Sequence, residues 1–243
     1  MNLSVIIPVY NEVRTINQII NKVLNVKTQY KEIIIVDDNS TDGTKKELEN
    51  YKNNNLFKIL HHKINKGKGA CLITAVPHLT GDYVIIQDAD LEYEPNDFVN
   101  FIRLIKERPE INVVFGSRVL NRKIIQKGFM VKFRIFANYV LTTLSNLFNN
   151  QNLTDAHTCY KLMKVEVIKK LNLSHEDFSI CPEITTKLSR LKYKIIEIPI
   201  NYKGRNYSEG KKIRFKDAIL ALYTLIKFRF FWKKIDKNQI NNY

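Results

Sequence analysis

Hydrophobic positions in the first half of the chain form short, nearly unbroken runs separated by helical patterns. The runs predict strands at residues 3–9, 32–37, 57–61, 83–88 and 113–116. Apolar residues spaced three and four apart predict helices at 15–24, from about Thr44, and at 67–78 and 96–107, with Thr44-x-x-Glu47 as a capping box. Apolar strands alternating with helices predict an α/β fold with a mostly parallel central sheet and helices on both faces.

The second half is less regular. The pattern there predicts helices at 129–148 and 182–190, short strands at 159–163 and 194–200, and a basic, aromatic-rich helix at 215–235. No internal repeat or low-complexity linker separates the halves. We therefore expect one main domain over residues 1–215, followed by an amphipathic C-terminal helix and tail over 216–243.

Charge adds one feature to this outline. The net charge is +15, and residues 203–237 hold 11 basic and 3 acidic residues, which is more than half of it. Such an excess favours an anionic partner: nucleic acid, an acidic membrane surface or a phosphorylated substrate. The alternative is compositional drift in a chain rich in Lys, Asn and Ile.

The cysteines and the hydrophobic runs indicate the compartment. Cys71, Cys159 and Cys181 are widely spaced without a C-x-x-C pair, which argues against a disulfide framework and against a zinc site. The N-terminus enters a strand pattern directly, so we expect no secretory signal, and no apolar run approaches the roughly 18–20 residues of a membrane span. We expect a cytoplasmic protein.

Candidate chemistry lies at the predicted strand ends. Polar residues end four strands, in the segments Pro8-Val-Tyr-Asn-Glu12, Asp37-Asp38-Asn-Ser-Thr-Asp-Gly43, Asp88-Ala-Asp90 and Gly116-Ser-Arg118. Ligands of open α/β sheets bind beyond the carboxyl ends of the strands. Asp88 and Asp90 offer the oxygen ligands that Mg²⁺ and Mn²⁺ prefer; the alternative is a helix cap. Asp37 and Asp38 either form a turn or accept hydrogen bonds from a ribose or base.

Together the motifs resemble family 2 glycosyltransferases with the Rossmann-like GT-A fold, and within them the dolichol-phosphate mannose synthase-like branch. The resemblance covers roughly residues 1–215. It rests on Ile6-Ile-Pro-Val-Tyr-Asn-Glu12, Val36-Asp-Asp-Asn-Ser-Thr-Asp-Gly43, Asn65-Lys-Gly-Lys-Gly69, Asp88-Ala-Asp-Leu91, Gly116-Ser-Arg118 and Arg205-Asn-Tyr-Ser-Glu-Gly-Lys211. It implies that residues 1–120 bind a nucleotide-diphosphate sugar and that 121–215 bind the acceptor.

The resemblance also implies roles for single residues. Asp88, Asp90 and, as a third ligand, Glu92 would hold Mg²⁺ or Mn²⁺. Arg118, Arg205 and Lys211 would bind phosphates, and Asp90 acts with them in catalysis. The remaining donor contacts would come from Pro8, Tyr10, Glu12, Val36, Asp38 and Ala89. Plausible contacts to an acceptor phosphate are Lys132, Arg134 and Asn138.

The implied reaction inverts the anomeric carbon by in-line attack. A hydroxyl acceptor needs a general base, whereas an ionised phosphate does not. Asp155 and Glu183 are the candidates for a base, although each is better suited to orient an Arg, a Lys or the substrate. His157 and Cys159 are expected to form pocket wall rather than act as nucleophiles.

Several acceptors and one other class of protein compete at this point. A polyprenyl phosphate is favoured if the C-terminal helix lies at the inner face of an anionic membrane, rather than only packing on the domain. The alternative acceptor is a saccharide hydroxyl in cell-surface polysaccharide synthesis. A basic nucleic-acid-binding module is a remote alternative, because the charge lies mostly outside the sheet; we expect no nucleic acid partner. A nucleotidyltransferase would more usually show a Gly-rich phosphate loop beside the first strand.

Overall fold

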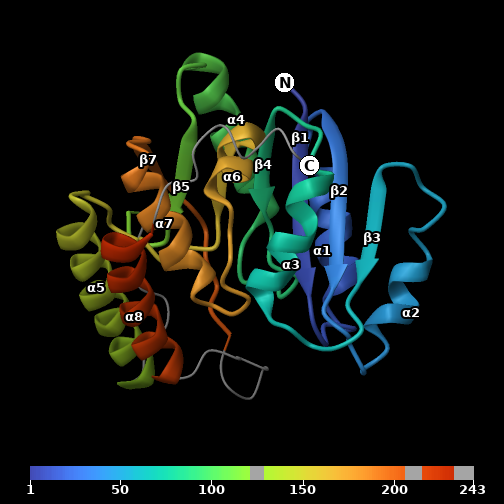
Figure 1. The fold of residues 1–243 in the computed structure, drawn as a ribbon. Helices are drawn as coiled ribbons and strands as arrows, with labels where there is room; N and C mark the ends of the chain where they lie inside the picture. The colour runs from blue at the N-terminus through green and yellow to red at the C-terminus, as the bar shows by residue number, and fades with distance from the viewer. Residues whose placement is uncertain (121–128, 206–214, 233–243) are drawn as a thin grey trace.

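A seven-stranded mixed sheet forms the centre of the molecule (Figure 1). The structure is a computed structural model that describes residues 1–120, 129–205 and 215–232, with only the backbone described for 129–134 and 215–219. The strand order is β3-β2-β1-β4-β6-β5-β7. The strands are β1 (Leu3–Val9), β2 (Tyr30–Asp37), β3 (Phe57–His61), β4 (Tyr83–Ile86), β5 (Val113–Ser117), β6 (Lys161–Lys164) and β7 (Ile195–Pro199).

The predicted parallel sheet is confirmed, with one exception to parallel order. β1 pairs in parallel with β2 and β4, β2 with β3, and β5 with β7. β6 is antiparallel to both β4 and β5. β5 consequently runs in the same direction as β4, and the carboxyl ends of β1, β2, β4 and β5 lie at one edge.

Helices cover both faces, and each strand of the centre contributes alternate residues to two cores. One core joins Leu3, Val5 and Ile7 of β1 to the helices α1, α2 and α4; the other joins Ile6 to α3, α6 and α7. The helices are α1 (Ile16–Asn25), α2 (Thr44–Glu49), α3 (Lys68–Ala75), α4 (Phe98–Glu107), α5 (Phe129–Asn149), α6 (Val165–Leu171), α7 (Ile180–Arg190) and α8 (Phe215–Phe231). Two 3-10 turns, η1 (Val76–His78) and η2 (Pro95–Asp97), complete the order.

The apolar spacing explains these helices. In α4 the buried residues are Phe98, Phe101, Ile102 and Ile105, which recur at the three- and four-residue spacing of one helical face. Each such side chain contributes about 1.5–3 kcal/mol when fully buried. The sheet face therefore determines which side of each helix is apolar.

Two local predictions need correction. The capping box at Thr44 is wrong: the residue before α2 is Gly43 with φ 99°, and Asp42 Oδ1 accepts a hydrogen bond from the Thr44 N–H at 3.0 Å. Thr44 is instead the first helical residue. The helix α6 was not predicted, since seven residues directly after a strand give too short a periodic pattern.

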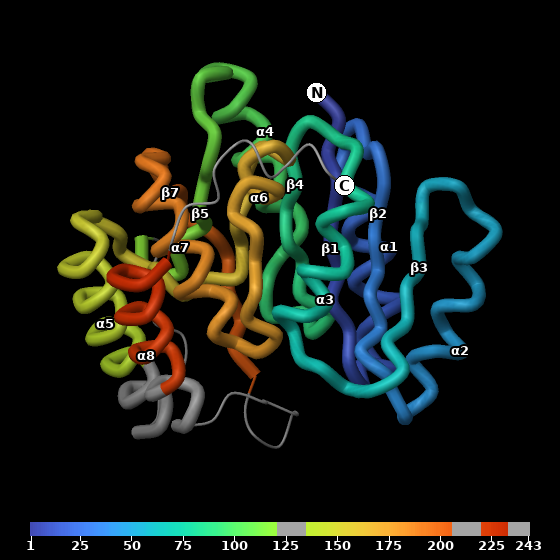
Figure 2. Tube along the Cα trace, in the orientation of Figure 1, coloured from blue at the N-terminus to red at the C-terminus, as the bar shows by residue number. Residues whose placement is uncertain are grey.

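The last helices form a separate layer beyond α7. α8 contacts α5 and α7, and the tube in Figure 2 shows α5 and α8 side by side at one end of the sheet. Arg190 of α7 donates to the main-chain carbonyl of Phe228 at 3.2 Å, near the end of α8. Within the described part of the chain, no helix combines the length and apolar character needed to cross a membrane.

Candidate active site

Residues from four predicted strand ends share the carboxyl edge of the sheet. Glu12 follows β1, Asp38 follows β2, Asp90 follows β4 and Arg118 follows β5. This edge is where open α/β sheets bind ligands. The structure thus brings together residues that the sequence separates by more than one hundred positions.

The loops after β1 and β2 are joined by hydrogen bonds. The Asn11 N–H donates to Ser40 Oγ at 2.9 Å, and the Glu12 N–H donates to Thr44 Oγ1 at 2.9 Å. In the other direction, the Thr41 N–H donates to Asn11 Oδ1 at 2.8 Å. The short polar side chains after β2 therefore fix the backbone that presents Glu12.

The turn after β4 holds an unusual backbone conformation. Leu91 has φ 61°, the left-handed region, and the Glu92 N–H donates to Asp90 Oδ1 at 3.1 Å. A left-handed non-Gly residue costs roughly 1–2 kcal/mol, and such strain is concentrated at functional sites. The turn directs Asp90 and Glu92 toward the end of β7 and the segment that follows it.

Arg205 lies among the acidic residues of this edge. Its guanidinium donates to both Glu12 carboxylate oxygens at 3.0 and 3.1 Å and to Asp90 Oδ2 at 2.9 Å. Its main-chain N–H donates to Glu92 Oε1 at 2.6 Å. We call Glu12, Asp90, Glu92 and Arg205 the Arg205 cluster. Three of the predicted donor or metal residues and one predicted phosphate-binding residue are therefore in direct contact.

Negative charge is concentrated in the Arg205 cluster. Burial, then the carboxylates of Asp88 and Glu92, raise the pKa of Asp90 from 3.8 to about 7, although Arg205 acts in the opposite direction. The side chain of Asp90 is still 19% exposed. An added cation stabilises the charged form of a carboxyl group whose pKa is raised in this way. An all-oxygen set of acids with excess negative charge fits a hard divalent ion.

Asp88 faces a different partner, which the sequence did not identify. Lys68 of α3 forms an ion pair with Asp88 and lies 3.0 Å from Cys159 Sγ. Burial would lower the pKa of Lys68, but Asp88 raises it well above its ordinary value, so the ammonium stays charged. The only signal in the sequence was the position of Lys68 within the motif Asn65-Lys-Gly-Lys-Gly69.

Arg118, which is partly exposed, forms a bidentate ion pair with the buried carboxylate of Asp155. The guanidinium donates to Asp155 Oδ2 at 2.6 Å and Oδ1 at 2.8 Å, and Asn138 donates to Oδ1 at 3.2 Å. Burial alone would raise the pKa of Asp155, yet Arg118 lowers it to about 2. A fully buried carboxylate of that pKa is a weak base, and this geometry favours orientation of Arg118.

Tyr202 joins this ion pair to the Arg205 cluster. Its hydroxyl donates to Glu92 Oε2 at 2.7 Å, and Arg118 lies over its ring, 5.2 Å from the centroid. Tyr93 packs against the same ring at 5.1 Å and accepts a hydrogen bond from the Cys159 N–H at 3.0 Å. This aromatic pair of Tyr93 and Tyr202 has no signal in the sequence, because the two residues lie far apart in the chain and match no motif.

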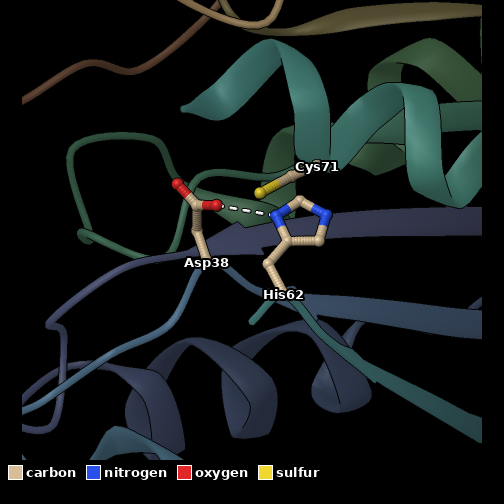
Figure 3. Close-up of side chains that lie close together, drawn as sticks. All are labelled: Asp38, His62 and Cys71. Carbon is tan, nitrogen blue, oxygen red and sulfur yellow. Dashed lines mark hydrogen bonds and ion pairs between the residues drawn. The ribbon is translucent and has the colours of Figure 1, made fainter. Parts of the chain in front are cut away.

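Asp38 is buried and organises the loop after β3. Its carboxylate accepts hydrogen bonds from the main-chain N–H groups of Lys66 at 2.9 Å and Gly67 at 2.7 Å, and it contacts His62 (Figure 3). Gly67 has φ 105°, and a Cβ there would lie 2.6 Å from the Glu176 carbonyl oxygen. The glycine therefore permits both the turn and the close approach of the loop before α7.

The other predicted donor contacts occupy less polar positions. Pro8 and Val36 are register partners on β1 and β2, and both are buried. Ala89 is 4% exposed between the two acids of the turn, and Tyr10 is half-buried at the end of β1. Their contact with a nucleotide stays a prediction.

Some predicted residues lie outside this arrangement or outside the described residues. Lys211 is outside the described residues, as are the side chains of Lys132 and Arg134. Glu183 is buried in α7, where it accepts from the Ser174 and His175 N–H groups at 2.8 Å and pairs with Lys187. Burial lowers the pKa of His157 to about 4.

Comparison with known proteins supplies an independent line of argument. The family model described as "Glycosyl transferase family 2" matches residues 4–171. The chain is 29% identical to Dolichyl-phosphate beta-glucosyltransferase ALG5A of Trichomonas vaginalis, over 97% of this chain and 76% of that protein. It is 27% identical to Dolichol-phosphate mannosyltransferase of Pyrococcus furiosus, over 94% of this chain. It spans 64% of that second protein, less than two thirds of its length.

Solved structures agree on the fold. Glucosyl-3-phosphoglycerate synthase from Mycobacterium tuberculosis, in complex with Mn²⁺, UDP-glucose and phosphoglyceric acid, superposes with a TM-score of 0.71. The match covers 94% of this chain and 79% of that chain at 17% identity. The same enzyme has also been solved with Mg²⁺ and UDP. The expected GT-A arrangement is thereby confirmed as a fold.

Proposed function

The chain belongs to glycosyl transferase family 2, and from this membership we propose that it transfers a sugar, with inversion, from a nucleotide-diphosphate sugar to a polyprenyl phosphate. The observation that carries the proposal is the Arg205 cluster. Carboxylates and a guanidinium meet there beside Asp88 and Lys68, at the edge where this fold binds ligands. Both relatives named above act, by their names, on dolichyl or dolichol phosphate.

We assign a divalent ion to the carboxylates of Asp88, Asp90 and Glu92, which the ion would have to draw together, because one oxygen from each does not lie within 4.8 Å of the other two in the structure. Bound there, Mg²⁺ or Mn²⁺ would stabilise the negative charge that forms on the leaving diphosphate. The raised pKa of Asp90 supports this assignment, because excess negative charge is what a cation relieves. The oxygen-only ligand set supports Mg²⁺ or Mn²⁺ over softer ions.

The basic residues then act on the phosphates. Arg205 neutralises Glu12 and Asp90 in the structure, and we assign its guanidinium to the donor diphosphate, with Lys211 as a second contact. Lys68 holds the carboxylate of Asp88 in place. Preorganised donors at a site of developing charge contribute more to catalysis than donors that must first be ordered.

The buried acids favour a phosphate as the acceptor. Asp155 is fully buried and bound to Arg118, and Glu183 is fully buried and bound to Lys187. Neither of these candidates for a general base is available to take a proton from a hydroxyl group. An ionised phosphate already carries its nucleophilic charge. We therefore favour a polyprenyl phosphate over a saccharide hydroxyl and assign Arg118 to orient the acceptor side.

The layer formed by α5 and α8 offers a surface for a lipid acceptor. Large apolar side chains are exposed on α5 and α8, namely Phe136, Tyr139, Val140, Leu147, Leu220, Tyr223, Ile226, Phe230 and Phe231. Lys227 and Arg229 lie on the same segment of α8. We propose that this layer binds peripherally to the inner face of an anionic membrane. Detergent-free flotation with anionic liposomes tests it; a protein that stays at the bottom of the gradient contradicts it.

A donor and acceptor panel tests the reaction. Radiolabelled nucleotide-diphosphate sugars are offered with dolichyl or undecaprenyl phosphate, and with Mg²⁺ or Mn²⁺. We expect label to pass into an organic-solvent-extractable product with at least one donor. Label that enters added oligosaccharide and none of the lipid would support the alternative acceptor and overturn this one.

A further inference from the structure

A second group of metal-ligand side chains meets at the edge of the sheet, away from the Arg205 cluster. Asp38 at the end of β2, His62 after β3 and Cys71 on α3 point toward one another (Figure 3). One ligand atom from each lies within 4.8 Å of the other two. Among the residues that the structure describes, no other three His, Cys, Asp or Glu side chains form such a group.

The three ligand atoms are close enough to be compared with those around a small tetrahedral ion. His62 Nδ1 lies 2.7 Å from Asp38 Oδ1, and Cys71 Sγ lies within 4.8 Å of a ligand atom of each of these residues. Zn²⁺ binds such ligands at about 2.0–2.3 Å, which sets neighbouring ligand atoms roughly 3.3–3.7 Å apart. The spacing between His62 and Asp38 is shorter than that value, and the spacings to Cys71 Sγ are at most 4.8 Å, so His62 and Asp38 must move apart for an ion to enter.

The ligand types select a soft ion. Imidazole and thiolate suit Zn²⁺ and similar transition metals, whereas Mg²⁺ prefers oxygen ligands alone. The carboxylate of Asp38 and the thiolate of Cys71 together balance the charge of a divalent ion. That balance matters because Asp38 and Cys71 are only 2% and 1% exposed, and a buried net charge is costly.

The surrounding groups orient the ligands as outer partners of metal sites do. Thr74 Oγ1 lies 2.9 Å from His62 Nε2, on the far side of the ring from Asp38. The Lys66 and Gly67 N–H groups hold the Asp38 carboxylate. Hydrogen bonds of this kind fix the tautomer and direction of metal ligands.

We propose that Asp38, His62 and Cys71 form a binding site for a soft divalent transition-metal ion, with Zn²⁺ as the reference ion. The fourth coordination position is left to water. Cysteine spacing argued against a zinc site, but here the ligands come from three separate elements, so no spacing could have revealed them. The site differs in ligand chemistry and place from the carboxylates assigned to Mg²⁺ or Mn²⁺.

Binding moves protons in a defined way. His62 coordinates through an unprotonated Nδ1, so its ring proton lies on Nε2, where the Thr74 hydroxyl accepts a hydrogen bond. Burial, then Asp38 and Asp37, raise the pKa of the Cys71 thiol well above its ordinary value, so this thiol is protonated before the ion binds. One proton, from the thiol, therefore passes to solvent per ion bound.

Cobalt spectroscopy tests the site without any activity measurement. Co²⁺ is titrated into ion-free protein in excess Mg²⁺, and the near-ultraviolet thiolate-to-cobalt band is recorded. We expect one Co²⁺ per chain, a band that Zn²⁺ removes, and loss of the band in Cys71→Ser. Absence of the band in the unmodified protein, or its persistence in Cys71→Ser, would overturn the proposal.

Matched variants test whether another cysteine binds the Co²⁺ and whether each variant is folded. Cys159→Ser, beside Asp88, and His61→Gln, beside Asp37, should keep the band, since neither residue touches the proposed ion. Thr74→Val keeps all three ligands and should weaken Co²⁺ binding at least about tenfold. A band lost in Cys159→Ser would place the ion elsewhere and contradict the proposal. Circular dichroism checks that each variant is folded.

One consequence rests on the proposed function. Since Asp38 is a predicted donor contact, Zn²⁺ should raise the KM for the nucleotide sugar, and more in the unmodified protein than in Cys71→Ser. The cobalt band does not depend on transfer, so a failure of the proposed function leaves that test intact. Equal zinc inhibition of both proteins, with the band present, would contradict the link between the ion and the donor.

Discussion

Two Arg–carboxylate groups at the same edge of the sheet differ in burial and in charge balance. In the Arg205 cluster, Glu12, Asp90 and Glu92 gather around one guanidinium, and Asp90 is 19% exposed with a pKa raised to about 7. The Arg118–Asp155 pair is balanced, and Asp155 is fully buried with a pKa lowered to about 2.

This difference indicates which group binds the ion and the donor and which group positions other residues. In the Arg118–Asp155 pair the two charges offset each other, whereas the Arg205 cluster has more carboxylates than cations and is stabilised by an added cation. We therefore assign ion and donor binding to the Arg205 cluster together with Asp88, and positioning to the Arg118–Asp155 pair. Tyr202 touches both groups, so the two are mechanically connected.

The largest expected effect is on transfer by Asp90→Ala. Removing a proposed ion ligand should reduce transfer at least about a thousandfold, because electrostatic stabilisation of the leaving diphosphate is lost. The fold should be retained, since a partly exposed rim carboxylate supports little packing. Asp82→Ala, an exposed acid just before the start of the same strand, is the control and should transfer normally. Near-normal transfer by Asp90→Ala would contradict the assignment of ion binding to this acid.

The next largest effect is on stability, at the other group. Asp155→Asn removes the buried counter-charge of Arg118, whose side chain is 21% exposed, so the loss should approach that of a broken buried pair, about 3–5 kcal/mol. Urea unfolding of the variant measures this. Glu110→Gln breaks the exposed pair with Arg108 and should leave stability almost unchanged. A loss at Asp155 as small as that at Glu110 would contradict the supporting role.

A somewhat smaller effect is expected for Arg205→Ala. Loss of one donor to a developing charge reduces kcat by about a hundredfold, or ~2.7 kcal/mol. Stability should also fall, because the buried carboxylates of Glu12 and Glu92 lose their counter-charge. Arg103→Ala, on the exposed surface of α4, is the control. An unchanged kcat in Arg205→Ala would show that the cluster does not bind the donor diphosphate.

The smallest effect is on the pH dependence of stability, and its sign differs between the groups. The pKa of Asp90 is raised from 3.8 to about 7 in the fold, so the folded state binds the extra proton and loses stability as pH rises through that window. The pKa of Asp155 is lowered to about 2, so its contribution is present above about pH 4 and lost toward pH 2.

Thermal unfolding of ion-free protein at several pH values measures both signs. The slope due to Asp90 is at most about 1.4 kcal/mol per pH unit. Asp90→Asn should reduce the change in stability between pH 4 and 7. The loss of stability below about pH 4, which is due to Asp155, should remain. An identical profile in the variant would contradict the shifted pKa.

The strands and the site edge were predictable, because both follow from local pattern. Leu3–Val9 and Phe57–His61 were predicted to the residue, since an apolar run bounded by polar residues has clear ends. The polar residues after β1, β2, β4 and β5 were expected at one edge of the sheet, because these strands run in the same direction. The predicted final helix extended to residue 235, whereas α8 ends at Phe231 and the residues after 232 lie outside the described part.

The side-chain partners were not predictable, because they are made by distant segments. Lys68 meets Asp88 across 20 residues, and Tyr202 meets Glu92 across 110. Cys71 reaches His62 and Asp38 only once α3 packs on β1 and β2. The antiparallel β6 carries no local signal of its direction, since a four-residue strand looks alike in either orientation.

The ion requirement of transfer tests the central claim most directly. Protein freed of divalent ions by a chelator is assayed for transfer from the active nucleotide-diphosphate sugar to polyprenyl phosphate, before and after Mg²⁺ or Mn²⁺ is restored. We predict background transfer in excess chelator and recovery on restoring either ion, with no recovery in Asp90→Ala. Undiminished transfer in excess chelator would contradict the assignment of a catalytic ion to Asp88, Asp90 and Glu92.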